Sequence, residues 1–202
     1  MKEVNEVDAR GLACPQPVLE TRKALERGER ELVVLVDSIS SRDNVLRYAG
    51  SIGCRVDFKE VSPGQFRISI HRDNATPLPE AEVSCPAPAH TGTVIYFGTD
   101  QMGRGSQELG RKLMGGFIRT WIDIEPRPWR MLFVNSGVHL TTDGSEVLEA
   151  IQLLEKRRVE VLSCGTCLEH FGLKEKLRVG RVTNMYEIIG TLNAAHRIIT
   201  PD

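Results

Sequence analysis

The 202-residue sequence lacks a surplus of charge of either sign and lacks any long apolar run. Its 26 Lys and Arg residues face 27 Asp and Glu residues, for a net charge of -1 at pH 7, so no global field attracts phosphate backbones or anionic membranes. No apolar stretch approaches the roughly 18 to 20 residues of a membrane span. The opening MKEVNEVDAR has neither the basic nor the apolar region of a secretory signal. We therefore predict a cytoplasmic protein whose partners include neither a membrane nor a nucleic acid.

Cysteine is scarce and odd in number. Five cysteines are spread along the chain, too thinly for the disulfide framework of a small secreted domain. In a reducing compartment such thiols are catalytic, metal-binding or simply buried. Apolar residues at 41% and charged residues at 26% are ordinary for a chain that folds around a core. Each cysteine therefore has to be judged from its surroundings.

Residues 1–72 alternate between strand-like and helix-like patterns. We expect, in order, a strand at 3–10, a helix that Gly28 ends, a strand at 31–38, a helix at 40–52, and a hairpin whose turn is Ser-Pro-Gly at 62–64. The β-branched run ELVVLV suits a covered strand, whereas the two hairpin strands alternate apolar with polar. This order predicts a small two-layer α/β sandwich.

Residues 73–92 contain four of the ten prolines and show no sustained period, which is typical of a linker. From 93 onward, strands at 93–98, 129–138 and 159–163 alternate with helical patterns at 106–122, 143–158 and 186–199. Asp143, with Glu146 three residues on, suggests a capping box. Alternating strands and helices predict a parallel sheet between two helix layers, a three-layer α/β domain at 93–202. Ligands of such sheets bind beyond the carboxyl ends of the strands, where Cys164 falls.

The segment GLACPQPVLE places Cys14 at the start of the first predicted helix. If Pro15 is the first helical residue, Cys14 is the N-cap, and its sulfur faces the free amides of Gln16 and Val18 and the positive end of the helix dipole. Pro17 keeps the turn rigid. This setting favours the nucleophilic thiolate and would equally stabilise a persulfide anion. The alternative is a small apolar residue packed at a helix start.

The string Cys-Pro-x-Pro alone is uninformative, because it recurs at Cys85 without a helical pattern after it. We interpret Cys85 as a passive linker cysteine. Cys54, which opens a predicted strand, is expected to be packed rather than reactive.

The stretch DARGLACPQPVLETRKAL resembles the signature of the TusA/SirA-like sulfur-carrier family. The matching residues are Asp8, Gly11, Leu12, Cys14, Pro15 and Pro17. The resemblance covers residues 3 to about 72 and implies that Cys14 carries sulfur as a persulfide. It further implies a donor protein, such as a cysteine desulfurase, and an acceptor protein. It assigns a supporting role to Asp8, Gly11, Pro15 and Pro17. No separate cofactor is expected, because the carried atom is bound covalently to cysteine.

The motif CGTC at Cys164 to Cys167 has several interpretations. Two residues between cysteines suit a dithiol redox pair, although the order of elements does not support a thioredoxin fold. With His170 the pair supplies three ligands where a structural zinc takes four, so no metal is expected. His170 either tunes a thiolate or faces solvent. The two cysteines could also be small buried residues at a strand end.

VEVLSCGTCLEHFGL, with the helix and strands before it, resembles the DsrE/F-like family of sulfur-relay proteins over residues 93–202. In that family the functional cysteine follows a strand and precedes a glycine by eight residues, which implies Cys164, with Gly172, as a second carrier and Cys167 as a possible resolving thiol. The resemblance also implies a homo-oligomer. Together, the two domains resemble sulfurtransferase-like selenium metabolism proteins, although no residue separates selenium from sulfur. The rival functions are a thiol-disulfide oxidoreductase at Cys164 and Cys167, and a regulatory or adaptor module with incidental thiols.

Overall fold

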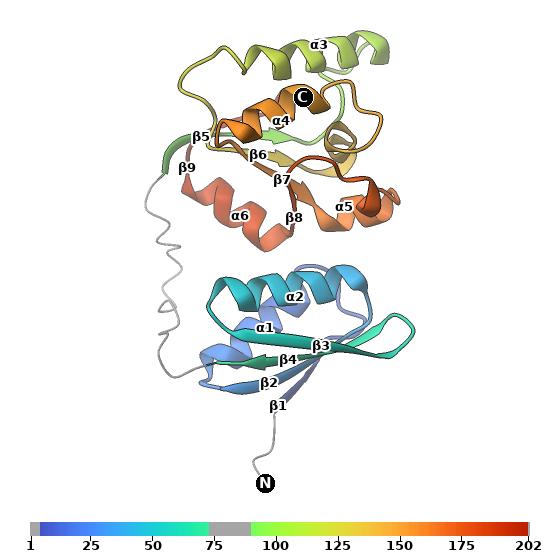
Figure 1. The fold of residues 1–202 in the computed structure, drawn as a ribbon, viewed down its shortest axis with the longest axis vertical. Coiled ribbons are helices and arrows are strands. Elements are labelled where there is room, and N and C mark those ends of the chain that lie inside the picture. The colour runs from blue at the N-terminus through green and yellow to red at the C-terminus, as the bar shows by residue number, and fades with distance from the viewer. Residues whose placement is uncertain (1–4, 73–89, 202) are drawn as a thin grey trace. The chain divides into compact units, whose positions relative to one another are not determined.

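The computed structural model describes residues 5–72 and 90–201, and the chain divides into two compact units, Met1–Ser84 and Cys85–Asp202 (Figure 1). Most of the predicted linker lies outside the described residues. Its last three residues, 90–92, belong to the first strand of the second unit. No helix in the described parts of the chain is long and apolar enough to cross a membrane.

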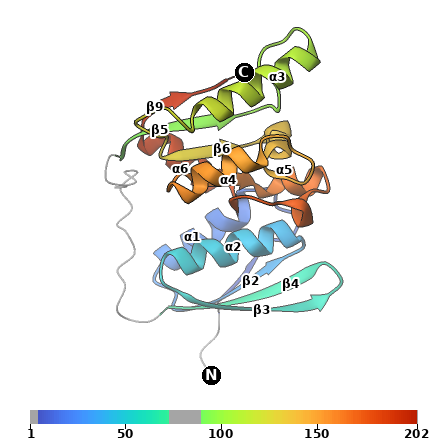
Figure 2. The ribbon, with the colours of Figure 1, turned by 45° about the horizontal axis from the view of Figure 1, so that its top comes forward.

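The first unit has one four-stranded sheet and two helices. Its elements are β1 (Asn5–Asp8), α1 (Gln16–Glu26), β2 (Glu31–Val36), α2 (Ile39–Ser51), β3 (Arg55–Ser62) and β4 (Gln65–His71). The strand order is β1-β2-β4-β3, with β1 parallel to β2 and the other pairs antiparallel. Both helices lie on the same face of the sheet (Figures 1 and 2). The predicted two-layer α/β sandwich is confirmed.

Local sequence explains these boundaries. Gly28, at φ +91°, follows the end of α1, and Gly64, at φ +77°, makes the turn of the β3–β4 hairpin, because glycine adopts this left-handed backbone without a Cβ clash. The run ELVVLV is buried after its first residue except at Leu35, whereas the edge strand β3 is largely exposed. The core therefore forms between the helices and the inner face of β2 and β4.

The second unit has a five-stranded sheet with helices on both faces. Its elements are β5 (His90–Phe97), α3 (Gln107–Thr120), β6 (Arg130–Phe133), the 3-10 helix η1 (Asn135–Thr141), α4 (Leu148–Lys156), β7 (Glu160–Cys164), α5 (Gly165–His170), the 3-10 helix η2 (Lys174–Lys176), β8 (Arg181–Thr183), α6 (Met185–Ala194) and β9 (Ala195–Ile199). The strand order is β8-β7-β6-β5-β9 and every pair is parallel. The predicted parallel three-layer domain is confirmed.

The alternation of side chains along the strands divides the core of this unit in two. Phe97 and Phe133 point to the face covered by α3 and α4, where their rings stack at 4.6 Å between centroids. Leu162 points to the opposite face and packs with Ile188 of α6. Helix α6 lies on the other side of the sheet from α3 and α4 (Figure 1). Cys164, two residues after Leu162, lies on this second face.

Three sequence predictions for this unit were wrong in detail. The helix expected at 186–199 ends at Ala194, and residues 195–199 form β9 because the backbone of β5 offers them a parallel partner. The strand expected at 129–138 ends at Phe133, and Asn135 begins a 3-10 helix. Helix α4 begins at Leu148 rather than near Asp143. The Asp143 carboxylate instead binds Arg178 at 2.6 Å.

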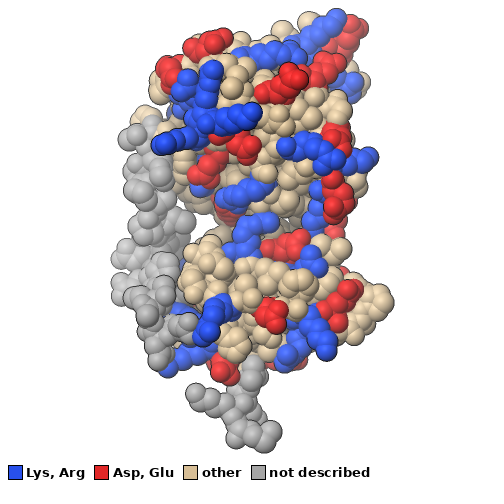
Figure 3. Space-filling view, in the orientation of Figure 1, with Lys and Arg blue, Asp and Glu red and all other residues tan. Residues whose placement is uncertain are grey.

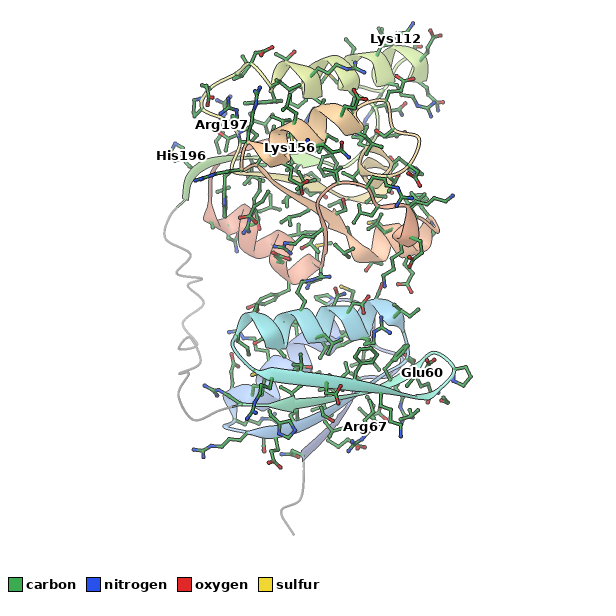
Figure 4. The ribbon with its side chains drawn as sticks, viewed as in Figure 1. Glu60, Arg67, Lys112, Lys156, His196 and Arg197 are labelled. Carbon is green, nitrogen blue, oxygen red and sulfur yellow. The ribbon has the colours of Figure 1, made fainter. Side chains whose placement is uncertain are left out.

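The surface carries both signs of charge. On the face shown in Figure 3, Lys and Arg are interspersed with Asp and Glu within each unit. Glu60 and Arg67, labelled in Figure 4, are exposed on the β3–β4 hairpin, and Lys112 points outward from α3. This face therefore presents no extended patch of one sign.

Candidate functional site

The loop that carries Cys14 is fixed by bonds to the end of β2. The Ala9 amide donates to the Leu35 carbonyl at 2.9 Å, and the Gly11 amide donates to the Asp37 carboxylate at 2.7 Å. Gly11 has φ +73°, so the glycine of the motif is required by the backbone of this turn. Sequence analysis missed Asp37, because nothing in the local pattern relates it to a loop 26 residues earlier.

Cys14 is not the N-cap of α1, contrary to the sequence prediction. Pro15 holds that position, at φ -98° and ψ 13°. The amides expected to face the sulfur are already bonded, Gln16 to the Ala13 carbonyl at 2.8 Å and Val18 to the Pro15 carbonyl at 3.0 Å. The helix starts one residue later than expected, because the Pro15 carbonyl is its first acceptor. Pro17 is buried in the first turn.

The hydrogen-bond donor at Cys14 comes from α2. Cys14 is half-buried, and the Asn44 side-chain amide nitrogen lies 3.9 Å from its sulfur. Asn44 itself is only 3% exposed, so its amide is held by the packing around it. The sequence contained only a weak indication of this role for Asn44, which is a polar residue on the apolar side of α2, next to Val45. The prediction did not include it.

Asp8 lies at the end of β1 and is exposed. Its carboxylate accepts hydrogen bonds from Arg10, from the guanidinium at 2.6 and 2.8 Å and from the backbone amide at 3.2 Å. These bonds hold the pKa of Asp8 at about 2. Asp8 therefore forms an exposed ion pair with Arg10, and at neutral pH the pair is fully charged.

Cys164 is the last residue of β7 and the N-cap of α5. It lies at the carboxyl end of a central strand of the sheet, as predicted, and is only 3% exposed. It packs in the apolar cluster that includes Leu132, Leu162 and Ile188. Its sulfur is thus largely withdrawn from solvent.

Cys167 lies three residues further on, in α5, and is half-buried. Its sulfur accepts a hydrogen bond from the backbone amide of Asn135 at 3.1 Å. Asn135 follows β6 and has φ +52°, a left-handed conformation that Asn tolerates better than most residues. This conformation points an amide at the sulfur from the neighbouring strand end. Sequence analysis did not identify Asn135.

The two thiols share a hydrogen bond that divides their acidities. That bond and burial raise the pKa of Cys164 well above its ordinary value. The same bond lowers the pKa of Cys167 to about 6; burial opposes this shift, and the Asn135 amide and the nearby His170 support it. The arrangement therefore favours the proton on Cys164 and the negative charge on Cys167.

The rest of the predicted second site follows from α5. Gly172, at φ +64°, ends the helix, and its amide donates to the Glu169 carbonyl at 3.0 Å. The His170 ring lies 5.0 Å from the Phe171 ring between centroids. Within residues 5–72 and 90–201, no group of three or more His, Cys, Asp or Glu residues is placed to hold a metal ion.

The other two cysteines differ in what the structure describes of them. Cys54 is 7% exposed, and burial raises its pKa, so the expectation of a packed thiol is confirmed. Cys85 lies outside the described residues.

The geometry defines a chain of two α/β units, each with a thiol next to a loop or strand end. Comparisons with known proteins agree with this class. Residues 5–72 match the family model "Sulfurtransferase TusA", and residues 130–201 match the "DsrE/DsrF-like family". The chain belongs to the TusA family through its first unit, and part of its second unit is similar to the DsrE/DsrF-like family.

Individual relatives match one unit each. The "Putative sulfur carrier protein MJ0990" of Methanocaldococcus jannaschii is 39% identical over 72 residues, which are 34% of this chain and 95% of the relative. A SirA-like protein of Desulfitobacterium hafniense, of known structure, is 35% identical over 33% of this chain and 93% of its own, with a TM-score of 0.31. The ychN protein of E. coli is 16% identical over 55% of this chain and 98% of its own, with a TM-score of 0.43.

Proposed function

We propose that the protein carries sulfur, or selenium, as a persulfide or perselenide on Cys14 and takes part in a relay between a donor and an acceptor protein. The observation that carries the proposal is the half-buried Cys14 thiol with an Asn44 amide 3.9 Å from its sulfur. Such a thiol is reachable by a partner and has a donor for the charge on an attacking or leaving sulfur. Membership of the TusA family and the similarity of residues 130–201 to the DsrE/DsrF-like family support a role in sulfur relay.

The transfer step is a displacement at sulfur. The Cys14 thiolate attacks the outer sulfur of the donor's persulfide, a new S–S bond forms at Cys14, and the donor's S–S bond breaks so that its cysteine leaves as a thiolate. In the second step the acceptor's thiolate attacks the outer sulfur of the Cys14 persulfide, and Cys14 leaves as a thiolate. The bonding pair of the donor's S–S bond leaves with the donor's thiolate, and the Cys14 thiolate supplies the pair of the new bond, so no external oxidant or reductant is needed. Selenium in place of the outer sulfur follows the same balance.

The second thiol site, at Cys164 and Cys167, is proposed as a further station of the relay. Each station then requires a protein partner, a cysteine desulfurase-like donor or an acceptor. A homo-oligomer formed through the second unit is part of the same proposal and is checked by light scattering of the purified chain.

The test uses the full chain and its Cys14→Ser variant. Both are incubated with a cysteine desulfurase and cysteine, or with glutathione persulfide, and the mass gained at each cysteine is read by peptide sequencing. We expect one sulfur atom on Cys14 of the native chain and none at position 14 of the variant. Cys54→Ala is the matched control, since it removes a buried cysteine of the same unit and should load normally. If Cys14 gains no sulfur but alkylates like an ordinary thiol, the carrier proposal fails.

A second candidate function rests on the hydrogen bond between Cys164 and Cys167. Two thiols in contact are placed to form a disulfide, so the second unit could exchange disulfides with a dithiol substrate. Catalytic turnover of such a substrate, lost in Cys167→Ser but kept in Cys14→Ser, would favour it over the carrier function.

A further inference from the structure

The two cysteines of the second unit differ in exposure and in the charge that their surroundings favour, although the backbone amides of Thr166 and Cys167 also favour a charge on Cys164. Cys164 is 3% exposed and packed among apolar side chains, whereas Cys167 is half-buried on α5. A nucleophile must be reached by the sulfur it attacks and must be a thiolate. Burial works against Cys164 on both counts, since it blocks approach and disfavours charge.

A hydrogen-bond donor is directed at Cys167 from a different element. The Asn135 amide, at the start of η1, lies 3.1 Å from the Cys167 sulfur. Asn135 is one of two described non-glycine residues with a positive φ. Residues held in this conformation cluster at functional sites. Here the conformation of Asn135 directs its backbone amide at the sulfur of Cys167.

We infer that Cys167, not Cys164, is the thiol of the second unit that attacks the incoming sulfur, and that Cys164 is a positioning residue that donates its S–H to it. The sequence resemblance implied the opposite assignment, with Cys164 as carrier and Cys167 as resolving thiol. The inference rests on the proposed function for the identity of the cargo, but the assignment of the thiolate is independent of it.

The step keeps atoms and electrons in balance. The Cys167 thiolate attacks the outer sulfur of a persulfide, forming a Cys167 S–S bond while the donor's S–S bond breaks and the donor leaves as a thiolate. The proton on Cys164 stays on its sulfur and keeps its hydrogen bond to the inner sulfur of the product. Cys164 therefore stabilises the charge of the Cys167 thiolate before the attack, and it is not itself modified.

The titratable groups around Cys167 come from three elements. Cys164 from β7 donates to it, and His170 on α5 favours its charge. From η1, which packs against α5, His139 lies with its ring 4.9 Å from that of Phe171. The short helix η2, which also packs against α5, bears Lys174 and Glu175. Cys164 is the largest of these influences, so its removal is the decisive change.

The first arm of the test measures the pH dependence of alkylation at each cysteine in the full chain, without any sulfur donor. Iodoacetamide labelling should give Cys167 a midpoint near pH 6 and leave Cys164 nearly unlabelled at neutral pH. In Cys164→Ala the Cys167 midpoint should rise by about one pH unit or more, toward the ordinary cysteine value near 8.5. Thr166→Ala, an exposed neighbour between the two cysteines, should leave it unchanged.

A second pair of variants guards against a fold defect in Cys164→Ala. Asn135→Gly keeps the amide and accepts φ +52°, so it should leave the Cys167 midpoint in place. Asn135→Val strains that conformation and should raise the midpoint. A Cys167 midpoint near 8.5 in the native chain, or unchanged in Cys164→Ala, would overturn the inference.

The second arm adds glutathione persulfide to the Cys14→Ser chain. Fragment sequencing should place the sulfur on Cys167, and Cys167→Ser should abolish it. Sulfur on Cys164 in the native pair would overturn the assignment. If the pH midpoints are as expected but neither thiol takes up sulfur, the cargo of the proposed function is wrong at this site and the thiolate assignment stands.

Discussion

The two units each place a thiol beside an amide donor, but they build that donor differently. In the first unit the donor at Cys14 is the side chain of Asn44, from a helix 30 residues away. In the second unit the Cys167 sulfur receives the backbone amide of Asn135 and the thiol of Cys164. A side-chain donor is removed by one substitution, whereas a backbone donor is lost only when the local conformation changes.

The sheets explain this difference. Strand β1 is an edge strand paired only with β2, and the loop after it is held by the backbone bond from Ala9 to Leu35 and by the side chains of Asp37 and Asn44. Strand β7 lies between β6 and β8, so the chain after it meets the backbone that follows β6. A thiol at the carboxyl edge of a parallel sheet therefore has amides nearby that a thiol beside an edge strand lacks.

The largest expected effect is the loss of stability when a core residue of the second unit is truncated, which should leave the first unit intact. Phe133→Ala removes a fully buried ring stacked on Phe97 and should destabilise the second unit by about 3–5 kcal/mol. Calorimetry should show its transition at lower temperature. Cys167 should lose its selective labelling while Cys14 keeps its own. Phe58→Ala, which truncates a ring that is 44% exposed, is the control. Equal loss at Cys14 would mean that the units do not fold independently.

The donor at Cys14 gives the next largest effect. Asn44→Ala removes the side-chain amide that faces the sulfur, and hydrogen bonds to charged groups contribute about 1.5–3 kcal/mol. Alkylation and sulfur loading of Cys14 should therefore slow about tenfold or more. Ser51→Ala, at the exposed end of the same helix, should not change either rate. An unaltered rate in Asn44→Ala would mean that the Asn44 amide does not assist Cys14. The comparison of the donors at the two sites would then be wrong.

Local pattern predicted the parts of the fold that are decided locally. The strand ELVVLV, the hairpin and the glycines after α1 and within the hairpin turn were all expected, because burial period and turn chemistry act within a few residues. Strand β9 was missed because it pairs with β5, which is far away in the sequence. Ile198 of β9, for example, pairs with Val94 of β5, about half the chain away. A single sequence contains no signal for that pairing.

The functional roles of Cys14, Cys164 and Cys167 stay predictions. The sequence did not indicate the neighbours that the structure places at these thiols and their loops, Asn44, Asp37 and Asn135, because each contact joins residues 26 to 32 positions apart. The asymmetry between Cys164 and Cys167 depends on which one points into the apolar core. That direction follows from the register of β7 in the sheet. The spacing of the two cysteines in the sequence does not reveal this register.

Acid should distinguish the first helical turns of the two units. In the second unit, burial by itself raises the pKa of Glu187, but hydrogen bonds from Arg181 and Thr183 outweigh it and hold the pKa below its ordinary value of 4.5. A depressed folded-state pKa stabilises the fold above pH 4.5, and this stabilisation is lost as pH falls through the folded value. Glu187→Gln should therefore cost about 1–2 kcal/mol at pH 7 and progressively less as the pH falls below 4.5.

The matched substitution in the first unit is neutral in charge. Ser38 caps α2 and accepts from the Ser41 amide at 3.1 Å, so Ser38→Ala should cost about 1 kcal/mol at both pH values. Thermal unfolding of both variants at pH 7 and pH 3 checks the contrast. A Glu187→Gln cost that stays the same at pH 3 would show that its role is packing rather than charge.

The smallest effect concerns the two aspartates at the Cys14 loop. Asp37→Ala removes the acceptor of the Gly11 amide and should cost about 1 kcal/mol while slowing the loading of Cys14 severalfold. Asp8→Ala removes only an exposed pair with Arg10, and exposed pairs contribute little, so the thermal midpoint should hardly move. Melting curves and loading rates of both variants are compared side by side. Slower loading in Asp8→Ala than in Asp37→Ala would mean that the Asp8 charge acts on the donor protein, because its bonds within this chain do not hold the loop.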